Sequence, residues 1–387
     1  MTRRPAVLAL AAVLGIWLWQ LATVHFNYGG DWTALFNTAP NWPKPTFLAS
    51  ENVYTFPPGS LGYDGQMYHF MAHDPWIKRG AEAAMDDPAL RYRRILVPAL
   101  AWVTALGRDS AIHAAYVAVI LGFVFLGVYW FARAMVLQGR HPAWGLMFAV
   151  MPATLVSMDR MTVDVALAAL TAGFVLYSDD LHKGASRWKV LLILACAALT
   201  RETGLLLTAG YGVFLLSRRR FADLMWTVAT TLPAIFWYVY VSRHTPPEPS
   251  GEFANLIPLG GWIERVARPE VYPLPRWQAL AAVELDYIAL AGVALMLGHA
   301  AWLAWSRRWN ARAVAIYLFA AAIVFLGSRS VWEDAFSYGR VVTPLMVLLA
   351  VEDARPRLAF APVALIDARI GLNFLKQIVG VASHLIK

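Results

Sequence analysis

The densest group of polar and aromatic side chains in the sequence lies between residues 62 and 75. Asp64 stands before Gly65 in a turn dipeptide, and apolar residues then recur at i, i+3 and i+4 spacing, which predicts a short helix lying on a membrane surface. A carboxylate held at that depth could accept a proton from an attacking hydroxyl group. The alternative is that Asp64 only caps the helix, as Asp often does. Asp31, in Gly29-Gly30-Asp31-Trp32, is a second candidate acid.

Two arginine-containing segments could bind a phosphate group. Arg91, Arg93 and Arg94 precede an apolar segment, and planar guanidinium groups suit bidentate contact with phosphate oxygens. The alternative is an outer belt of arginines that contacts lipid head groups. Arg201 and Glu202 are adjacent in sequence, either as a structural ion pair or as a phosphate-binding arginine oriented by the glutamate.

Metal and cysteine chemistry have little support in the sequence. His69 and His73 have the i, i+4 spacing of two ligands on one helix face, but a third ligand is not evident, so no metal or other cofactor is expected. The single cysteine, Cys196, excludes an intramolecular disulfide and a zinc site built on cysteines.

The composition is that of a membrane protein. Of the 387 residues, 59% are hydrophobic and 15% charged, whereas soluble domains carry about 25% charge. The 17 Trp and 15 Tyr suit a protein with two membrane interfaces. The net charge of +8 comes from short basic clusters between apolar runs, so we interpret it as membrane topology and expect no nucleic-acid partner.

The apolar runs predict an all-α polytopic bundle of about ten membrane spans. The first run, 5–24, follows Arg3 and Arg4 as in a signal peptide, but its length and the missing Ala-x-Ala site indicate an uncleaved span. The later runs are 112–137, 143–158, 163–177, 190–200, 204–216, 221–241, 285–305, 313–327 and 341–351.

Basic residues predict the orientation of the bundle. With these spans, 14 Lys and Arg lie on the side of the N-terminus and 4 in the short loops of the other face, so both termini are expected in the cytoplasm. The apolar segment Leu96 to Gly107 would rise only about 18 Å as a helix, too little to cross, and is expected along the outer interface. We expect an integral protein of a bacterial inner or plasma membrane.

This assignment of membrane spans divides the chain into two parts. Residues 1–352 form the transmembrane domain, with a large first outer loop over 25–111 and a proline-rich second outer loop over 243–284. Residues 353–387 are expected to form an amphipathic tail on the cytoplasmic membrane surface. Two short helix pairs carry ionisable residues at their outer turns, among them Arg160, Asp164, Arg201 and Glu202. These residues predict a polar cavity in the outer half of the bundle.

Three motifs resemble one enzyme superfamily: Tyr63-Asp64-Gly65-Gln66-Met67-Tyr68, Ile95-Leu96-Val97-Pro98-Ala99-Leu100 and Leu199-Thr200-Arg201-Glu202-Thr203-Gly204. They look like those of the GT-C glycosyltransferases, and are most similar to the mannosyltransferase branch with an aromatic-Asp-small signature and an "IA" helix in the first outer loop. The resemblance implies a GT-C-like bundle that takes a sugar from a polyprenyl-phosphate donor on the outer or lumenal face.

We therefore expect an inverting glycosyltransferase that moves a monosaccharide to a glycan or glycolipid acceptor. Asp64 is the expected general base, with Asp31 as the second candidate, and Arg94 and Arg201 are expected to contact the lipid phosphate. The expected substrate-binding residues are Tyr63, Gln66, Tyr68, His69, Arg93, Arg94, Arg160, Asp164, Arg201, Glu202 and Arg340.

Two other classes of function stay open. One is a flippase or transporter of lipid-linked sugars, and the other is a non-catalytic membrane assembly subunit. An enzyme is favoured because polar residues gather at the outer face and no internal repeat is visible, whereas transporters often have repeats and a site near the bilayer midplane.

Overall fold

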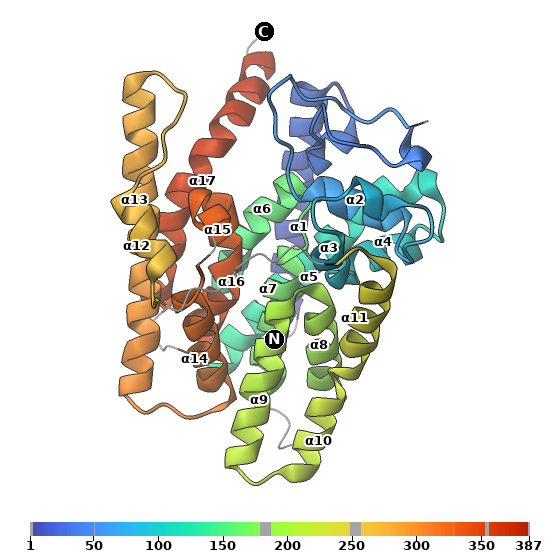
Figure 1. Cartoon of the computed structure of the whole chain (residues 1–387). Coiled ribbons are helices and arrows are strands. Elements are labelled where there is room, and N and C mark those ends of the chain that lie inside the picture. Colours follow the sequence, from blue (N-terminus) through green and yellow to red (C-terminus); the bar gives the residue numbers. More distant parts are fainter. Residues whose placement is uncertain are drawn as a thin grey trace.

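In the computed structural model, helices provide the regular structure of every described segment (Figure 1). The structure describes residues 3–49, 51–178, 187–247, 257–327, 329–352 and 356–385. Within these ranges there are 17 α-helices and no sheet, so the predicted all-α fold class is confirmed.

Six helical segments are long and apolar enough to cross a membrane, which indicates an integral membrane protein. They are α1 (Arg3–Tyr28), α5 (Ile112–Leu137), the consecutive helices α10 (Phe221–Ala229) and α11 (Leu232–His244), α13 (Arg276–Trp305), α16 (Ala335–Glu352) and α17 (Pro356–Leu385). Shorter helices pack among them: α7 (Asp164–Ser178), α8 (Arg187–Thr200), α9 (Leu205–Ser217) and α14 (Ala311–Val324).

Proline divides two runs that the sequence presented as single helices. The run 143–158 forms a 3-10 helix, η5 (Pro142–Val150), and then α6 (Pro152–Arg160). Met151 between them is extended, because a following proline disfavours the α conformation. The run 221–241 is divided before Pro233, which cannot donate a helical hydrogen bond.

The first loop forms a layer of short helices at the end of the bundle where α1 ends (Figure 1). It contains α2 (Gly65–His73), α3 (Pro88–Arg93) and α4 (Leu96–Thr104), with the 3-10 helices η1 (Trp32–Phe36), η2 (Thr46–Leu48), η3 (Ala81–Ala84) and η4 (Asp109–Ala111). Helix α4 packs against α2, α5 and α8. Its nine residues are too few to cross a membrane.

The C-terminal segment, expected as an amphipathic tail on the cytoplasmic membrane surface, forms one long helix. By length and composition α17 is a candidate span, and it packs against α1, α13 and α16. Gln377 donates to Asp159 at 2.5 Å and accepts from Asn27, at the end of α1, at 3.1 Å. Gln377 and Arg369 are therefore buried, whereas Lys376 and His384 on the same helix are exposed. The end of α17 lies with the end of α1 and the first loop (Figure 1).

A buried ion network joins the second loop to the bundle. Asp286 on α13 accepts from Arg265 of α12 (Gly260–Ala267) and from Arg369 of α17, each at 2.7 Å, and from Tyr272 at 2.7 Å. Buried charges need such partners to offset their loss of hydration. The network connects Arg265 and Tyr272 of this loop to α13 and α17. Residues 248–256 of this loop and 353–355, 386 and 387 of the expected tail lie outside the described residues.

Candidate active site

Asp64 is paired with two arginines and does not cap α2. It occupies the N-cap position, but its side chain makes no capping hydrogen bond. Its carboxylate oxygens lie 3.0 Å from Arg91 Nη1 and 2.5 Å from Arg340 Nη1. Arg91 belongs to α3 and Arg340 to α16, so this carboxylate joins the first loop to the bundle.

Further ion pairs extend from these three residues through the bundle. Arg340 Nη1 lies 3.4 Å from Asp164, at the start of α7, and Asp164 in turn pairs with Arg201. Arg94 lies 3.3 Å from Glu202 and donates to the Tyr68 hydroxyl at 3.4 Å. We call the ionised side chains the charged cluster: Asp64, Asp164, Glu202, Arg91, Arg94, Arg201 and Arg340.

The charged cluster and Asp86 together have equal numbers of positive and negative groups. Four guanidinium groups face three carboxylates within the cluster, and a fourth carboxylate, Asp86, reaches Arg91 from the more exposed side at 2.6 Å. Within the described part of the chain, the buried Arg340 Nε has no hydrogen-bond partner. The cluster can therefore accept an anionic group with oxygen acceptors, such as a phosphate.

The neighbouring arginines determine the electrostatics of Asp64. Burial would raise the pKa of the Asp64 carboxyl, but the positive charges of Arg340, Arg91 and Arg94 outweigh it and hold that pKa well below its usual range. Asp64 is thus ionised at neutral pH and, while paired in this way, a weak base.

Glycine at position 65 allows α2 to begin where it does. A Cβ atom there would lie 2.0 Å from the carbonyl oxygen of Arg160, the last residue of α6. Gly62 has φ +72, a conformation that other residues rarely adopt. The close approach of α2 to α6 places Asp64 beside the bundle helices that carry Arg340 and Asp164.

A polar and aromatic cavity of about 700 Å³ adjoins the charged cluster. Tyr63 lies between the two: the Arg340 guanidinium is 5.1 Å from the centre of its ring, and its hydroxyl is 3.3 Å from Asp334, in the cavity wall. The wall also contains the aromatic residues Tyr28, Tyr54, Phe56 and Phe336 and the basic residues Arg160 and Lys376. Apolar faces with a few polar groups are typical of ligand sites.

An apolar groove of about 370 Å³ lies beside α4. Leu96 and Leu100 of α4 line it together with residues of α5, α7 and α8. Arg94 precedes Leu96 by only two positions, so a charged group at Arg94 and an apolar chain in the groove could belong to one molecule.

The structure places several predicted site residues elsewhere. Asp31 caps η1, accepting from the Thr33 backbone at 2.9 Å and from its hydroxyl at 2.6 Å. Gln66 is buried and accepts from the Ala39 backbone, which is a structural contact. His69 contacts two other histidines, and the Arg93 guanidinium lies 5.8 Å from the centre of the Tyr238 ring.

The remaining predicted residues lie at the cluster or the cavity. Tyr63, Tyr68, Arg94, Asp164, Arg201, Glu202 and Arg340 are in or against the charged cluster, and Arg160, paired with Asp159 at 2.9 Å, lines the cavity. Arg201 and Glu202, considered as a pair, contact different partners.

Two contacts of the site were not predicted from the sequence. Arg91 was considered together with Arg93 and Arg94 as a phosphate-binding residue, but its pairing with Asp64 was not anticipated. Asp334 has no comparable sequence signal. Among the described residues, the group that could hold a metal ion is Glu51, His69, His73 and His113, away from the charged cluster.

Comparisons with protein-family models, with curated proteins and with solved structures give no match for this chain.

Proposed function

We propose that this protein is a GT-C-type inverting glycosyltransferase that moves a monosaccharide from a polyprenyl-phosphate donor to a glycan or glycolipid acceptor on the extracytoplasmic face. The observation that carries the proposal is the position of Asp64. An ionised carboxylate lies among arginines, and its neighbour Tyr63 lines a polar, aromatic cavity. This arrangement would offer phosphate-binding groups and a proton acceptor beside a cavity that could hold a sugar.

The groove suits the lipid-linked donor, and the cavity suits the acceptor. The isoprenoid chain of the donor would lie in the apolar groove beside α4, with its phosphate at Arg94 and Arg201. The acceptor would occupy the cavity, where aromatic faces and the polar groups of Asp334, Arg160 and Lys376 can contact sugar rings and hydroxyls.

The reaction is a single displacement at the anomeric carbon. The acceptor oxygen forms a bond to this carbon while the bond to the phosphate oxygen breaks, and Asp64 takes the proton of the hydroxyl group. Polyprenyl phosphate leaves with the electron pair, and guanidinium groups of the charged cluster stabilise its developing negative charge. Attack from the face opposite to the leaving group inverts the anomeric configuration.

Donor binding would also change the basicity of Asp64. A phosphate at Arg94 and Arg201 that also engages Arg340 or Arg91 would compete with the carboxylate for the same N–H donors. The loss of these contacts raises the pKa of Asp64 toward its ordinary value. The base would therefore become effective once the donor is present.

Sugar transfer in vitro tests this proposal. The purified protein, in liposomes with labelled polyprenyl-phosphate mannose, glucose or arabinose and with membranes as the acceptor source, is expected to transfer label from one donor to a glycan or glycolipid. Product analysis by NMR should show the inverted anomer. Movement of a labelled donor between leaflets without transfer would instead identify a transporter, and absence of both activities would favour an assembly subunit.

Cysteine labelling tests the proposed orientation. In a Cys196→Ala background, Val271→Cys in the second loop and Trp305→Cys at the end of α13 occupy positions that are 89% and 88% exposed. A membrane-impermeant maleimide is expected to modify the first in intact cells and the second only after lysis, because basic residues favour the cytoplasm. The reverse pattern would place Asp64 in the cytoplasm and contradict an extracytoplasmic reaction.

A further inference from the structure

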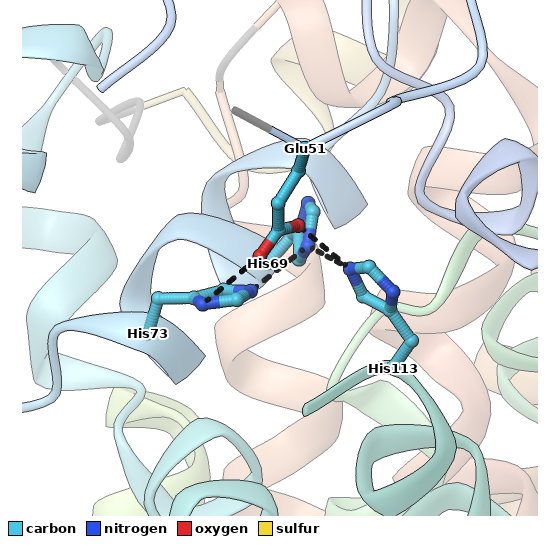
Figure 2. Close-up of side chains that lie close together, drawn as sticks. All are labelled: Glu51, His69, His73 and His113. Atoms are coloured by element: carbon cyan, nitrogen blue, oxygen red, sulfur yellow. Dashed lines mark hydrogen bonds and ion pairs between the residues drawn. The ribbon is translucent and has the colours of Figure 1, made fainter. Parts of the chain in front are cut away.

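Three imidazole rings and a carboxylate converge in the first loop (Figure 2). His69 and His73 lie one turn apart on α2, His113 is the second residue of α5, and Glu51 follows η2. Their nearest ligand atoms all lie within 4.8 Å of one another. His69 and His73 are buried, whereas Glu51 and His113 are partly exposed.

The three shortest distances in this group are close to those between the ligands of one metal ion, and all the ligand atoms lie within 4.8 Å of one another. His69 Nε2 lies 2.8 Å from His113 Nε2 and 3.2 Å from His73 Nε2, and Glu51 Oε2 lies 3.3 Å from His113 Nε2. In a tetrahedral zinc site with Zn–N distances near 2.0 Å, neighbouring ligand atoms are about 3.3 Å apart. Figure 2 shows the three rings and the carboxylate directed toward one another.

Hydrogen bonds within this group cannot satisfy all of its ring nitrogens. The Nε2 atom of His69 faces two other Nε2 atoms, but a ring nitrogen offers either one N–H or one lone pair. It can therefore donate to one neighbour or accept from one, and the remaining contact is unpaired. A cation would accept the lone pairs of all three rings simultaneously.

A second layer of contacts orients one of the rings. Asp109 lies 2.9 Å from His73 Nδ1, and Arg79 donates to both carboxylate oxygens of Asp109 at 2.8 and 2.9 Å. A carboxylate at Nδ1 favours the tautomer whose Nε2 lone pair is free for a metal. Carboxylate–histidine contacts of this kind typically support metal ligands.

We propose that Glu51, His69, His73 and His113 bind one divalent transition-metal ion, for which zinc best suits four nitrogen and oxygen ligands. This differs from the expectation of no metal, because two of the four ligands come from segments that the helix spacing did not connect. An open cavity of about 570 Å³, lined by Glu51 and His113, gives the ion access from solvent.

The ion would act as a structural link. It joins the segment after η2 and the start of α5 to α2, and Asp64 directly precedes α2. His69 lies five residues after Asp64, or about 7 Å along the helix axis. The bound ion would thereby help to hold Asp64 at the charged cluster, while metal binding itself can be measured independently of sugar transfer.

Metal analysis of the purified full-length protein tests this inference. After chelator treatment, incubation with Zn²⁺ and gel filtration in detergent, mass spectrometry is expected to find about one zinc per chain. His113→Asn and Glu51→Gln, at the two partly exposed positions, should each abolish stoichiometric binding. His244→Asn is the control, because His244 is exposed and contacts a backbone carbonyl on α11.

Two further measurements make the result decisive. Asp109→Asn should weaken zinc binding by about 10- to 100-fold while helical circular dichroism stays unchanged. Co²⁺ bound to the stripped wild-type protein should give the intense visible absorption of tetrahedral coordination. Wild-type protein that retains no zinc, or His113→Asn protein that binds as much zinc as wild type, would overturn the proposal. Either result would leave the proposed sugar transfer and the proposed role of Asp64 to be decided by their own assays, which do not measure metal content.

Discussion

The Asp64→Asn variant is expected to transfer sugar about 10²- to 10⁴-fold more slowly than wild type while still folding and binding the donor. The amide keeps the shape of the side chain but cannot accept the proton of the acceptor hydroxyl. Removing a negative charge from between Arg91 and Arg340 also leaves these arginines free for the phosphate. Donor affinity should therefore be maintained or increased. Initial rates at saturating donor, together with a separate donor-binding titration, measure the two effects.

Asp31→Asn is the matched control for this experiment. Asp31 is also an acid of the first loop, but it caps η1 and lies outside the charged cluster. Because Asn caps a helix about as well as Asp, this substitution should change stability little and leave transfer largely intact. Near-normal transfer by Asp64→Asn together with loss of transfer in Asp31→Asn would assign the base to Asp31. Normal transfer by both variants would count against the enzyme.

The Arg340→Gln variant is expected to lower the rate of transfer by about 10²- to 10³-fold, the typical cost of removing one group that stabilises transition-state charge. It should also change the pH dependence. The positive charge of Arg340 makes the largest electrostatic contribution to lowering the pKa of Asp64, so its loss raises that pKa. Asp64 acts as a base only when deprotonated, so the acid limb of the pH–rate profile should move to higher pH.

A comparison of Arg340→Lys with Arg340→Gln separates the effect of charge from that of side-chain shape at this position. Arg340→Lys keeps the positive charge but loses the planar guanidinium group, so it should lower the rate while moving the acid limb less. Arg329→Gln is the control, since Arg329 is exposed and pairs with Glu333 one turn away. An Arg340→Gln profile with wild-type rates and an unmoved acid limb would show that Arg340 does not act on Asp64 or on the leaving group.

Local sequence patterns predicted most helices and the segments that carry the candidate site. Long apolar runs specify helices because unpaired backbone groups are costly in lipid, and this holds for α1, α5 and α13. Asp64 was chosen as the candidate base because it lies in a predicted turn directly before a predicted short helix. The breaks at Pro152 and Pro233 could also have been predicted, since proline acts on its immediate neighbours.

The C-terminal helix shows where such patterns mislead. The apolar and polar faces of α17 are real, but Arg369 and Gln377 are buried against other helices and do not face water. A hydrophobic stripe shows only that one face of a helix is more apolar than the other. It does not show whether the polar face contacts solvent or buried partners, because those partners, Asp286 and Asp159, come from distant parts of the chain.

The sequence by itself determined the all-α class, the membrane-length helices and the presence of acidic and basic residues near the ends of helices. Only the tertiary structure decided which of these residues meet. Asp64 and Arg340 are 276 positions apart and pair at 2.5 Å, while the adjacent Arg201 and Glu202 contact different partners. Likewise His113 and Glu51 complete the group begun by His69 and His73. Helical periodicity relates residues within a few turns, whereas contacts between helices depend on packing geometry that one segment does not encode.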